Sequence, residues 1–395
     1  MRRGVAIPKS LSEPPITFPV HFAPGQFFSC TDCGKCCTSG WVVNVSDEMA
    51  DSIKETESYR ELEREGYLPL QVVNGTSRLG KTTDDVCLYH RKDGCDLHRE
   101  LGAREKPITC RSYPFQVVQA EEAYFVSLAY SCPAALDGSG DPLFQYKTRL
   151  EDFLVVDSGM ILRCPQGENG YPLTSEHQMT WTEYLQLEKA LFHADPADPV
   201  LFLLNASASI VQQTVSLGRL EVEELEFYRP NGLLVDAVQT FPIFATACLS
   251  IIERDLDFDK REAFAEAFQN GLNPKSHLLD APCPNFELLQ PDNQVVREIL
   301  LRYLRNLIAG KRLLLGPNLV SRLLMLSVSV SLLLYYQKFQ AELRQTRHFN
   351  FEQWEWAFEM IELNLVTHNN DLQPYFQQFE KALTAIARVR EGVAT

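Results

Sequence analysis

The sequence predicts an α+β, cysteine-rich N-terminal domain followed by an all-α helical domain. Two observations predict this class. Eight of the eleven cysteines fall within residues 30–132, in a stretch of short, turn-rich segments. After about residue 166, apolar residues recur over long helical periods instead. The expected divisions are 1–29 for an extended lead-in, 30–165 for the cysteine-rich domain and 166–395 for the helical domain.

The chain is acidic, with 37 Lys and Arg against 52 Asp and Glu and a net charge of −15. Nucleic acids attract basic surfaces, so we expect no nucleic-acid partner. Residues 1–10 contain two arginines but no apolar segment of the length that a signal peptide needs. We therefore expect a cytoplasmic location, where thiols stay reduced and clustered cysteines bind metals more often than they form disulfides.

Short elements are expected in the N-terminal half. Five prolines within 1–29 predict an extended segment. Ser46 is a candidate N-cap for a helix that runs to about Glu65. The segments predicted to form strands are 41–45, 71–78, 113–118 and 124–130. Within the second of these, Asn74-Gly75 between apolar residues predicts a hairpin.

Eight helices are predicted in the remainder of the chain from the spacing of apolar residues. Their ranges are 182–194, 205–217, 235–254, 260–270, 293–309, 318–341, 351–367 and 374–390. Residues 313–336 are apolar enough to suggest a membrane helix, but Arg322 leaves an uninterrupted stretch shorter than the ~20 residues that a span needs. We therefore interpret this segment as a buried helix and expect no membrane span.

The densest group of cysteines is Cys30-x2-Cys33-x2-Cys36-Cys37, with Gly34 allowing a tight turn. Four thiols so close in sequence can converge on one point, and as thiolates they suit zinc or iron–sulfur clusters better than Ca or Mg. The eight candidate metal ligands are Cys30, Cys33, Cys36, Cys37, Cys87, Cys95, Cys110 and Cys132. They are more than one four-coordinate ion can use. Residues 30–165 are therefore predicted to be a cysteine-cluster metal-binding domain.

The spacing leaves two partitions of these thiols open. In the first, a [4Fe–4S] cluster uses the C-x2-C-x2-C…C-P spacing of ferredoxins. Its ligands are Cys30, Cys33, Cys36 and a distant Cys-Pro such as Cys132. The other four thiols then form a second site, namely Cys37, Cys87, Cys95 and Cys110. In the second partition, two ions lie close together and the adjacent Cys36 and Cys37 bind different ions. The cofactor is either an iron–sulfur cluster or zinc.

A short hairpin is predicted around Gly94, with Cys87 facing Cys95 across it. His90 and His98 each follow one of these cysteines by three residues, which is a spacing seen in metal ligands. Because eight thiols already suffice, we interpret both histidines as partly exposed residues of the hairpin.

Other candidate residues receive a structural interpretation. Glu359, Glu362 and His368 could line a cleft, but charged helix residues are most often solvated, and we interpret the two glutamates that way. Three cysteines lie outside the motif: Cys164, Cys248 and Cys283. Cys248 is expected in a helix core, whereas the other two are in loop-like sequence and could be spare ligands.

The cysteine motifs resemble the YkgJ-type cysteine-cluster family, a zinc- or iron-chelating domain, over about residues 27–135. The helical segments 300–312 and 359–368 are similar to the C-terminal part of flagellin lysine-N-methylases. This second resemblance implies methyl transfer from S-adenosylmethionine to a lysine-bearing protein substrate. An acidic surface would steer such a cationic substrate toward the chain.

Three functions are therefore compared. The first is a protein-lysine N-methyltransferase of the flagellin lysine-N-methylase type. The second is a non-enzymatic metal-binding module for metal storage, delivery or sensing. The third is a structural metal site, with the function residing in the helical domain. The sequence shows no strand followed by a G-x-G-x-G loop, the usual way in which a doubly wound fold holds S-adenosylmethionine.

Overall fold

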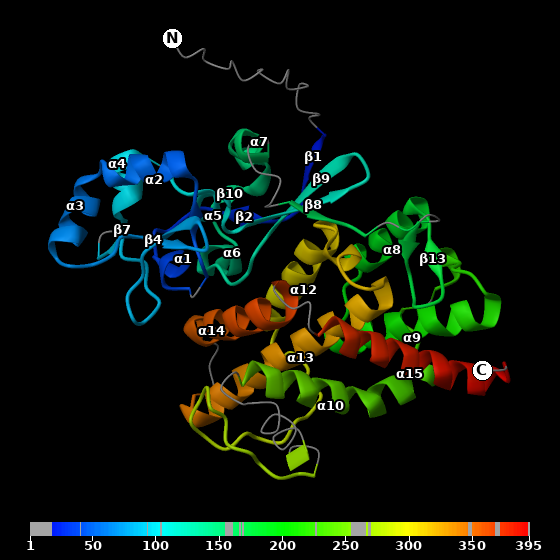
Figure 1. Ribbon diagram of the computed structural model, residues 1–395. Helices are drawn as coiled ribbons and strands as arrows, with labels where there is room; N and C mark the ends of the chain where they lie inside the picture. Colours follow the sequence, from blue (N-terminus) through cyan, green and yellow to red (C-terminus); the bar gives the residue numbers. More distant parts are fainter. Residues whose placement is uncertain are drawn as a thin grey trace.

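The N-terminal region mixes short strands with short helices, and the C-terminal region is mostly helical, as predicted (Figure 1). This computed structural model describes residues 18–39, 41–92, 94–102, 105–154, 161–165, 167, 170–225, 227–253, 266–267, 270–346, 350–367 and 372–393. The division between residues 165 and 166 stays a prediction. Most of the helix predicted at 260–270 lies outside the described residues.

The N-terminal region contains a four-stranded sheet and several smaller strand pairs. In chain order its strands are β1 (Val20–Phe22), β2 (Phe27–Phe28), β3 (Asn44–Val45), β4 (Leu70–Val73), β5 (Thr76–Leu79), β6 (His90–Arg91), β7 (Gly94–Cys95), β8 (Phe115–Ala120), β9 (Ala123–Leu128), β10 (Asp141–Pro142) and β11 (Ile161–Arg163). Its helices are α1 (Lys35–Thr38), α2 (Asp47–Lys54), α3 (Glu57–Arg64), α4 (Asp96–Leu101), α5 (Ile108–Ser112), α6 (Pro133–Asp137), η2 (Leu143–Tyr146) and α7 (Lys147–Leu154).

The main sheet has the strand order β1-β9-β8-β11, with β8 and β9 forming an antiparallel hairpin between two parallel edge strands. A second sheet, β3-β5-β4, contains the hairpin predicted at Asn74-Gly75. The single helix predicted from Ser46 to Glu65 is instead divided into α2 and α3. The break occurs because the hydroxyl of Thr56 accepts a hydrogen bond from the Tyr59 N–H at 3.2 Å and starts a new helix.

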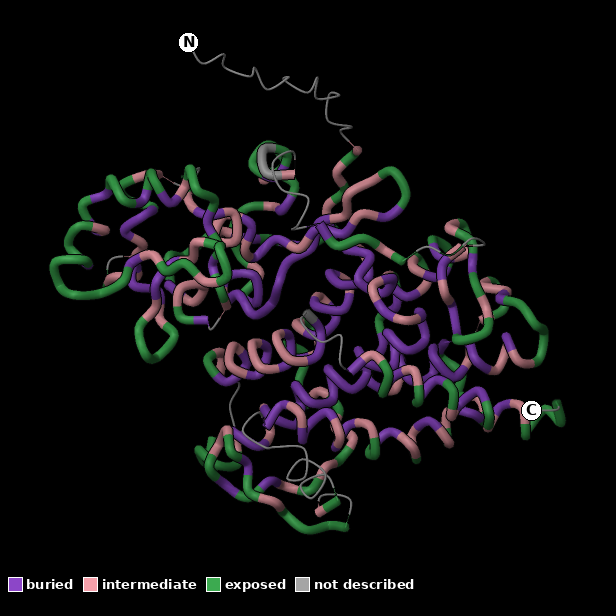
Figure 2. Tube along the Cα trace, viewed as in Figure 1, coloured by how far each residue is buried: buried purple, intermediate pink, exposed green. Residues whose placement is uncertain are grey.

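The C-terminal region is a helical assembly built around α13. Its elements are β12 (Tyr171–Pro172), β13 (Gln178–Met179), α8 (Trp181–His193), α9 (Pro199–Leu217), η4 (Val222–Glu224), α10 (Gly232–Ile252), α12 (Gln294–Ala309), η5 (Arg312–Leu314), α13 (Leu319–Leu343), α14 (Phe351–Ile361), the π-helical turn η6 (Glu362–Thr367) and α15 (Gln373–Glu391). Helix α13 packs against α9, α10, α14 and α15, and Figure 2 shows its trace almost entirely buried.

Three helices in the described residues are long and apolar enough to cross a membrane, so the expectation of no membrane span is wrong. They are α9, α10 and α13, with hydropathies of 1.4, 1.6 and 1.7 over their most apolar windows. Arg322 does not interrupt the apolar segment, because α13 continues through this residue. The Arg322 guanidinium is buried and donates to the carbonyl oxygens of Arg312 and Val366, both at 3.1 Å. The apolar window of α13 is wholly buried inside the structure.

The buried apolar residues form two separate clusters. The main core extends from Phe28 and the β8–β9 hairpin through all the long helices. A satellite core of ten buried residues lies under β3, β5, α2, α3 and α4. The side-chain amide of Asn306 in α12 ties the sheet to the helices, because it accepts from the Leu128 N–H at 2.9 Å and donates to the Leu128 carbonyl at 2.8 Å. The cysteine segments lie between the two cores.

Candidate metal centre

Seven of the eight predicted ligands line one cavity of about 180 Å³, although they come from separate segments of the chain. They are Cys30, Cys33, Cys36, Cys37, Cys95, Cys110 and Cys132. The eighth, Cys87, does not line the cavity but is buried beside it, where its N–H donates to the carbonyl oxygen of Cys37 at 2.9 Å. All eight thiols are free.

The first four thiols are gathered by a tight turn that leads into α1. Asp32 and Gly34 both have left-handed backbone conformations, with φ of 52° and 72°. The Gly34 carbonyl then accepts the N–H of Cys37 at 2.8 Å. A side chain at Gly34 would require the imidazole ring of His90 to move, because a Cβ there would lie 2.2 Å from that ring. The sequence predicted the turn, but not that His90 packs against it.

The β8–β9 hairpin brings Cys110 and Cys132 together. In its register Phe115 pairs with Leu128, so the residues before β8 and after β9 emerge at the same end of the hairpin. Cys110 lies in α5, just before β8. Cys132 is the residue before the first turn of α6, which begins with Pro133.

The β6–β7 hairpin differs from the one predicted. Cys95 pairs with His90 and not with Cys87, which instead forms a bridge with Lys81. His90 and His98 both line the cavity, so they lie closer to the candidate ligands than the sequence analysis proposed. The Nδ1 atom of His90 is buried and has no hydrogen-bond partner in the described structure.

Burial keeps most of the thiols protonated when no metal is bound. Burial raises the pKa of Cys87 to about 11, and it raises the pKa of Cys110 and of Cys132 to about 12. Cys36 is different, because its sulfur lies 3.9 Å from the sulfur of Cys37 and their hydrogen bond lowers the pKa of Cys36 to about 7. A metal ion must therefore displace protons to bind most of these sulfurs.

Two neighbouring groups can be distinguished among the thiols by the core that they contact. Cys37, Cys87, Cys95 and Cys110 belong to or pack against the satellite core, whereas Cys132 belongs to the main core. Burial and the charges of Cys33 and Cys30 raise the pKa of Cys132, whereas burial and the charges of Cys87, Cys36 and Cys95 raise that of Cys110. Cys36 interacts with thiols of both groups, which places the groups side by side.

Basic side chains from distant segments also reach the cavity. Lys106 and Arg149 line it, and Lys106 lowers the pKa of Cys36 as well as that of Cys110 against the larger effect of burial. Lys35 forms an ion pair with Glu359 of α14, at 2.6 Å, which connects α1 to the helical region. These cations offset the negative charge that several thiolates would create. Lys106 lies only four residues before Cys110, so its place in the sequence could have indicated it, whereas no sequence signal marked Arg149.

The donor set fits zinc or iron, but the thiols are not yet arranged around an ion. Among the described residues, no three His, Cys, Asp or Glu side chains form a group that could hold a metal as they stand. Thiolate sulfur is nevertheless the preferred ligand of structural zinc and of iron–sulfur clusters. Seven thiols that line one small cavity, all of them free, therefore make zinc or iron the metals that this site suits.

The remaining predicted residues lie elsewhere. Cys164, Cys248 and Cys283 do not line the cavity, and Cys248 is buried in α10 as predicted. The interpretation of Glu362 as a solvated helix residue is wrong, because its side chain is fully buried and accepts a hydrogen bond from the Ser131 N–H at 2.7 Å. His368 lies outside the described residues.

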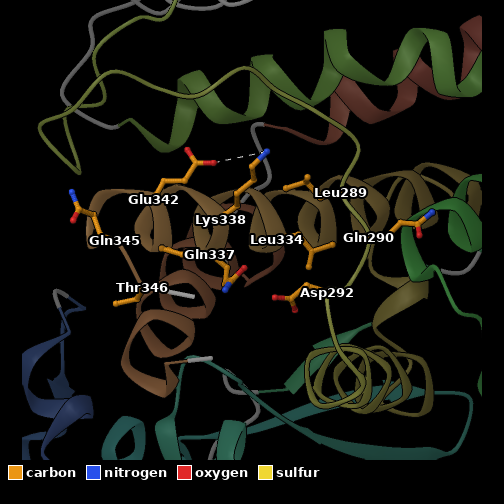
Figure 3. Close-up of a pocket in the computed structure, with 10 residues that line it drawn as sticks. Leu289, Gln290, Asp292, Leu334, Gln337, Lys338, Glu342, Gln345 and Thr346 are labelled. Atoms are coloured by element: carbon orange, nitrogen blue, oxygen red, sulfur yellow. Dashed lines mark ion pairs between the residues drawn. The ribbon is translucent and has the colours of Figure 1, made fainter. Parts of the chain in front are cut away.

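A larger cavity of about 590 Å³ lies on the C-terminal half of α13, away from the cysteines (Figure 3). Its charged residues include Lys338 and Glu342, which face each other 4.0 Å apart. Lys338 also pairs with Glu287 at 3.1 Å. Among the described residues that line this cavity there is no cysteine or histidine, so the cysteine cavity is the better candidate for metal chemistry.

Comparison with known protein families supports the interpretation of the cysteines. Residues 29–133 match the family CxxCxxCC, described as "putative zinc- or iron-chelating domain". Neither the curated proteins nor the solved structures contain a match to the chain. The similarity to flagellin lysine-N-methylases therefore gains no homologue that supports it, and the matched segment covers the cysteine motifs without the long helices.

Proposed function

We propose that the protein chelates zinc or iron through two adjacent four-thiol sites. The accessible site comprises Cys30, Cys33, Cys36 and Cys132. The structural site comprises Cys37, Cys87, Cys95 and Cys110. The observation that carries the proposal is the convergence of seven cysteines on one cavity, and the CxxCxxCC match supports the choice of zinc or iron. Four thiols complete either a zinc site or an iron–sulfur site.

A structural role for the second site is supported by the small size of the satellite core. This core has only ten buried residues in the described structure, and Cys87 is one of them. The other three thiols of the structural site pack against it. A small core gains stability from a metal because the unfolded chain has no preformed site, so the free energy of binding adds to that of folding.

An exchangeable role for the first site is supported by exposure. Cys30 and Cys33 are exposed, on a loop between β2 and α1. Water and competing ligands can therefore reach an ion held there, while the fourth ligand of this site, Cys132, belongs to the main core. Such a site suits metal delivery or sensing better than a purely structural function. Lys106 and Arg149 stabilise the thiolates that form when the metal displaces their protons.

The two sites are distinguished by removing one thiol from each. The protein and the variants Cys33→Ser and Cys110→Ser are purified without oxygen, and bound metal, acid-labile sulfide and the visible spectrum are measured. Each variant should lose about half of the bound metal, because three thiols leave a four-coordinate site incomplete. Cys248→Ala is the matched control and should keep the full metal content, since this thiol is buried in α10.

Release of metal to a chelator provides the second measurement. The wild type should release its metal in a fast and a slow phase, and Cys33→Ser should lack the fast phase. Full metal content in both Ser variants would show that these cysteines are not ligands. A single release phase, or complete loss of metal from either variant, would contradict two separate sites. Brown protein with acid-labile sulfide would identify iron–sulfur clusters, and colourless protein with bound zinc would identify zinc.

A further inference from the structure

We propose that a second cavity, next to the cysteine cavity, binds a small organic carboxylate whose apolar body contacts the walls and whose charge is paired with Arg312. The cavity has a volume of about 350 Å³, within the range of small-molecule sites. This proposal does not depend on the function proposed above, because none of the cysteines lines this cavity.

The walls of the cavity are mostly apolar and partly aromatic. Trp41, Tyr113, Phe115, Val117 and Leu363 are among the residues that line it. Trp41 and Tyr113 pack against each other, with ring centroids 4.8 Å apart. Such walls favour a ligand with an apolar body over a small hydrated anion, because they offer few polar groups to replace its water.

The exposure of the lining residues distinguishes the opening of the cavity from its buried part. Val42 and Leu162 line it and are 51% and 41% exposed, so they mark its opening. Arg312 in η5 also lines it but is only 2% exposed, so this residue belongs to the buried part of the cavity wall. An amphiphilic ligand would therefore enter with its charged end leading.

Arg312 is incompletely paired. Its Nη2 donates to the carbonyl oxygen of Val366 at 3.3 Å, but its Nε and Nη1 are buried without a hydrogen-bond partner in the described part of the chain. A buried, unpaired guanidinium is costly, so native structures pair such groups with an anion or with hydrogen-bond acceptors. A ligand carboxylate would provide both.

The local charges favour a monoanion. Two buried cations, Arg312 and Arg322, lie together and both donate to the Val366 carbonyl. One buried carboxylate, Glu362, lies nearby, but its Oε1 has no partner in the described structure and its Oε2 accepts from Ser131. Above about pH 7, where Glu362 is ionised, the group carries one excess positive charge. A carboxylate would neutralise it, whereas a phosphate dianion would leave an excess negative charge.

The cavity shares a wall with the metal centre. Tyr113 and Pro114 line both cavities, so a bound carboxylate would lie one side chain away from the cysteines. The hydroxyl of Tyr113 lies 3.5 Å from that of Ser131, next to Cys132. This position suits a ligand whose binding is sensed by the metal centre, or whose reaction takes place there.

The test measures the binding of probe pairs that differ only in charge. A panel of aryl and alkyl carboxylates, including 4-phenylbutyrate and decanoate, and the matching alcohols are titrated into the full chain by calorimetry, with and without bound metal. Because a charge-assisted hydrogen bond to a buried group contributes about 1.5–3 kcal/mol, carboxylates should bind about 10- to 100-fold more tightly than the alcohols. Phenyl phosphate should bind more weakly than the best carboxylate.

Variants locate the binding. Arg312→Met should reduce carboxylate affinity at least ~10-fold without affecting the alcohols, and Arg312→Lys should restore part of it. Leu162→Trp should block the opening, whereas Leu272→Trp, at another exposed leucine, should leave binding unchanged. If Arg312→Met fails to fold, the comparison of Leu162→Trp with Leu272→Trp still tests the proposal. Absence of binding by every carboxylate, equal binding of the alcohols, or binding that persists in both Arg312→Met and Leu162→Trp would overturn the proposal.

Discussion

The burial of the charged residues Glu362 and Arg312 could not be predicted from the sequence. Glu362 lies in the predicted helix 351–367 and Arg312 lies between the predicted helices 293–309 and 318–341, and exposure is the usual condition of Glu and Arg. In the structure they are fully or almost fully buried, because η5 and η6 fold back against the β8–β9 end of the sheet. Burial raises the pKa of Glu362 to about 7, and the Ser131 N–H and Arg312 limit that rise.

This raised pKa predicts how stability depends on pH. Because the pKa of Glu362 in the folded protein lies above its ordinary value of 4.5, the neutral carboxyl stabilises the fold below about pH 4.5. That stabilisation is lost as the pH rises through about 7. The shift corresponds to about 3 kcal/mol. Glu362→Gln removes the titration but keeps an oxygen that can accept the Ser131 N–H.

Urea unfolding should therefore show that Glu362→Gln gains stability relative to the wild type as the pH rises from 4.5 to 8, by up to about 3 kcal/mol. Glu61→Gln, at an exposed position of α3, is the control for the substitution itself. A stability difference that stays constant over this range would show that Glu362 does not titrate as its burial implies.

At the scale of elements, the sequence patterns correctly predicted the turns, strands and helices that depend on residues close together in the chain. The Asn74-Gly75 turn, the β8–β9 pair and most helices lie where the patterns indicated, because turn residues and apolar periods act locally. The errors occur where side chains end or extend a helix. Thr56 divides α2 from α3, and Asp198 starts α9 at Pro199 by accepting two backbone N–H groups. The Asp198-Pro199 pair in the sequence is typical of a helix start and could have predicted this one.

The turn before α1 gives the prediction at this scale. Gly34→Ala places a Cβ in a left-handed conformation, at a cost of about 1–2 kcal/mol, and also against the His90 ring. We expect lower metal content and easier proteolysis near α1. Gly25→Ala is the matched control, because Gly25 has a φ of 70° and open space around it.

A second substitution distinguishes the effect of the contact with His90 from the effect of the backbone strain at residue 34. Gly34→Ala combined with His90→Ala should regain metal content, since the smaller side chain leaves room for the new Cβ. If Gly25→Ala reduced bound metal as much as Gly34→Ala, the contact with His90 would not be the cause. If the double variant stayed as deficient as the single one, His90 would be needed for metal binding in its own right.

For the whole molecule, the cysteine spacing identified the candidate ligands but not their surroundings. The motif is local, so Cys30 to Cys37 were recognisable without a fold. Arg149 reaches the cysteine cavity, and the cysteine cavity shares a wall with the Arg312 cavity, only because the hairpin and the helices pack together. The spacing of residues in the sequence does not predict this packing. The membrane expectation failed for the same reason, because the partners that let α13 continue through Arg322 come from η5 and η6.

We expect removal of the metal to reduce protection from hydrogen exchange and proteolysis in the satellite core more than in the main core. The satellite core is small and contacts the four thiols of the proposed structural site, whereas the main core has apolar packing of its own through α13. Chelation should therefore raise hydrogen exchange over residues 41–92 and permit cleavage at the exposed turn Asn74-Gly75. The β8–β9 hairpin should stay protected with the long helices, because Asn306 holds it to α12.

Hydrogen–deuterium exchange and limited proteolysis of the metal-loaded and chelated protein measure this response, with circular dichroism to follow the helices. Cys110→Ser should reproduce the chelated pattern, and Cys33→Ser should not, since Cys33 is an exposed loop residue outside the satellite core. Loss of protection in α13 together with residues 41–92 would mean that the two cores unfold as one unit. Unchanged exchange after chelation would mean that the structural site does not stabilise the satellite core.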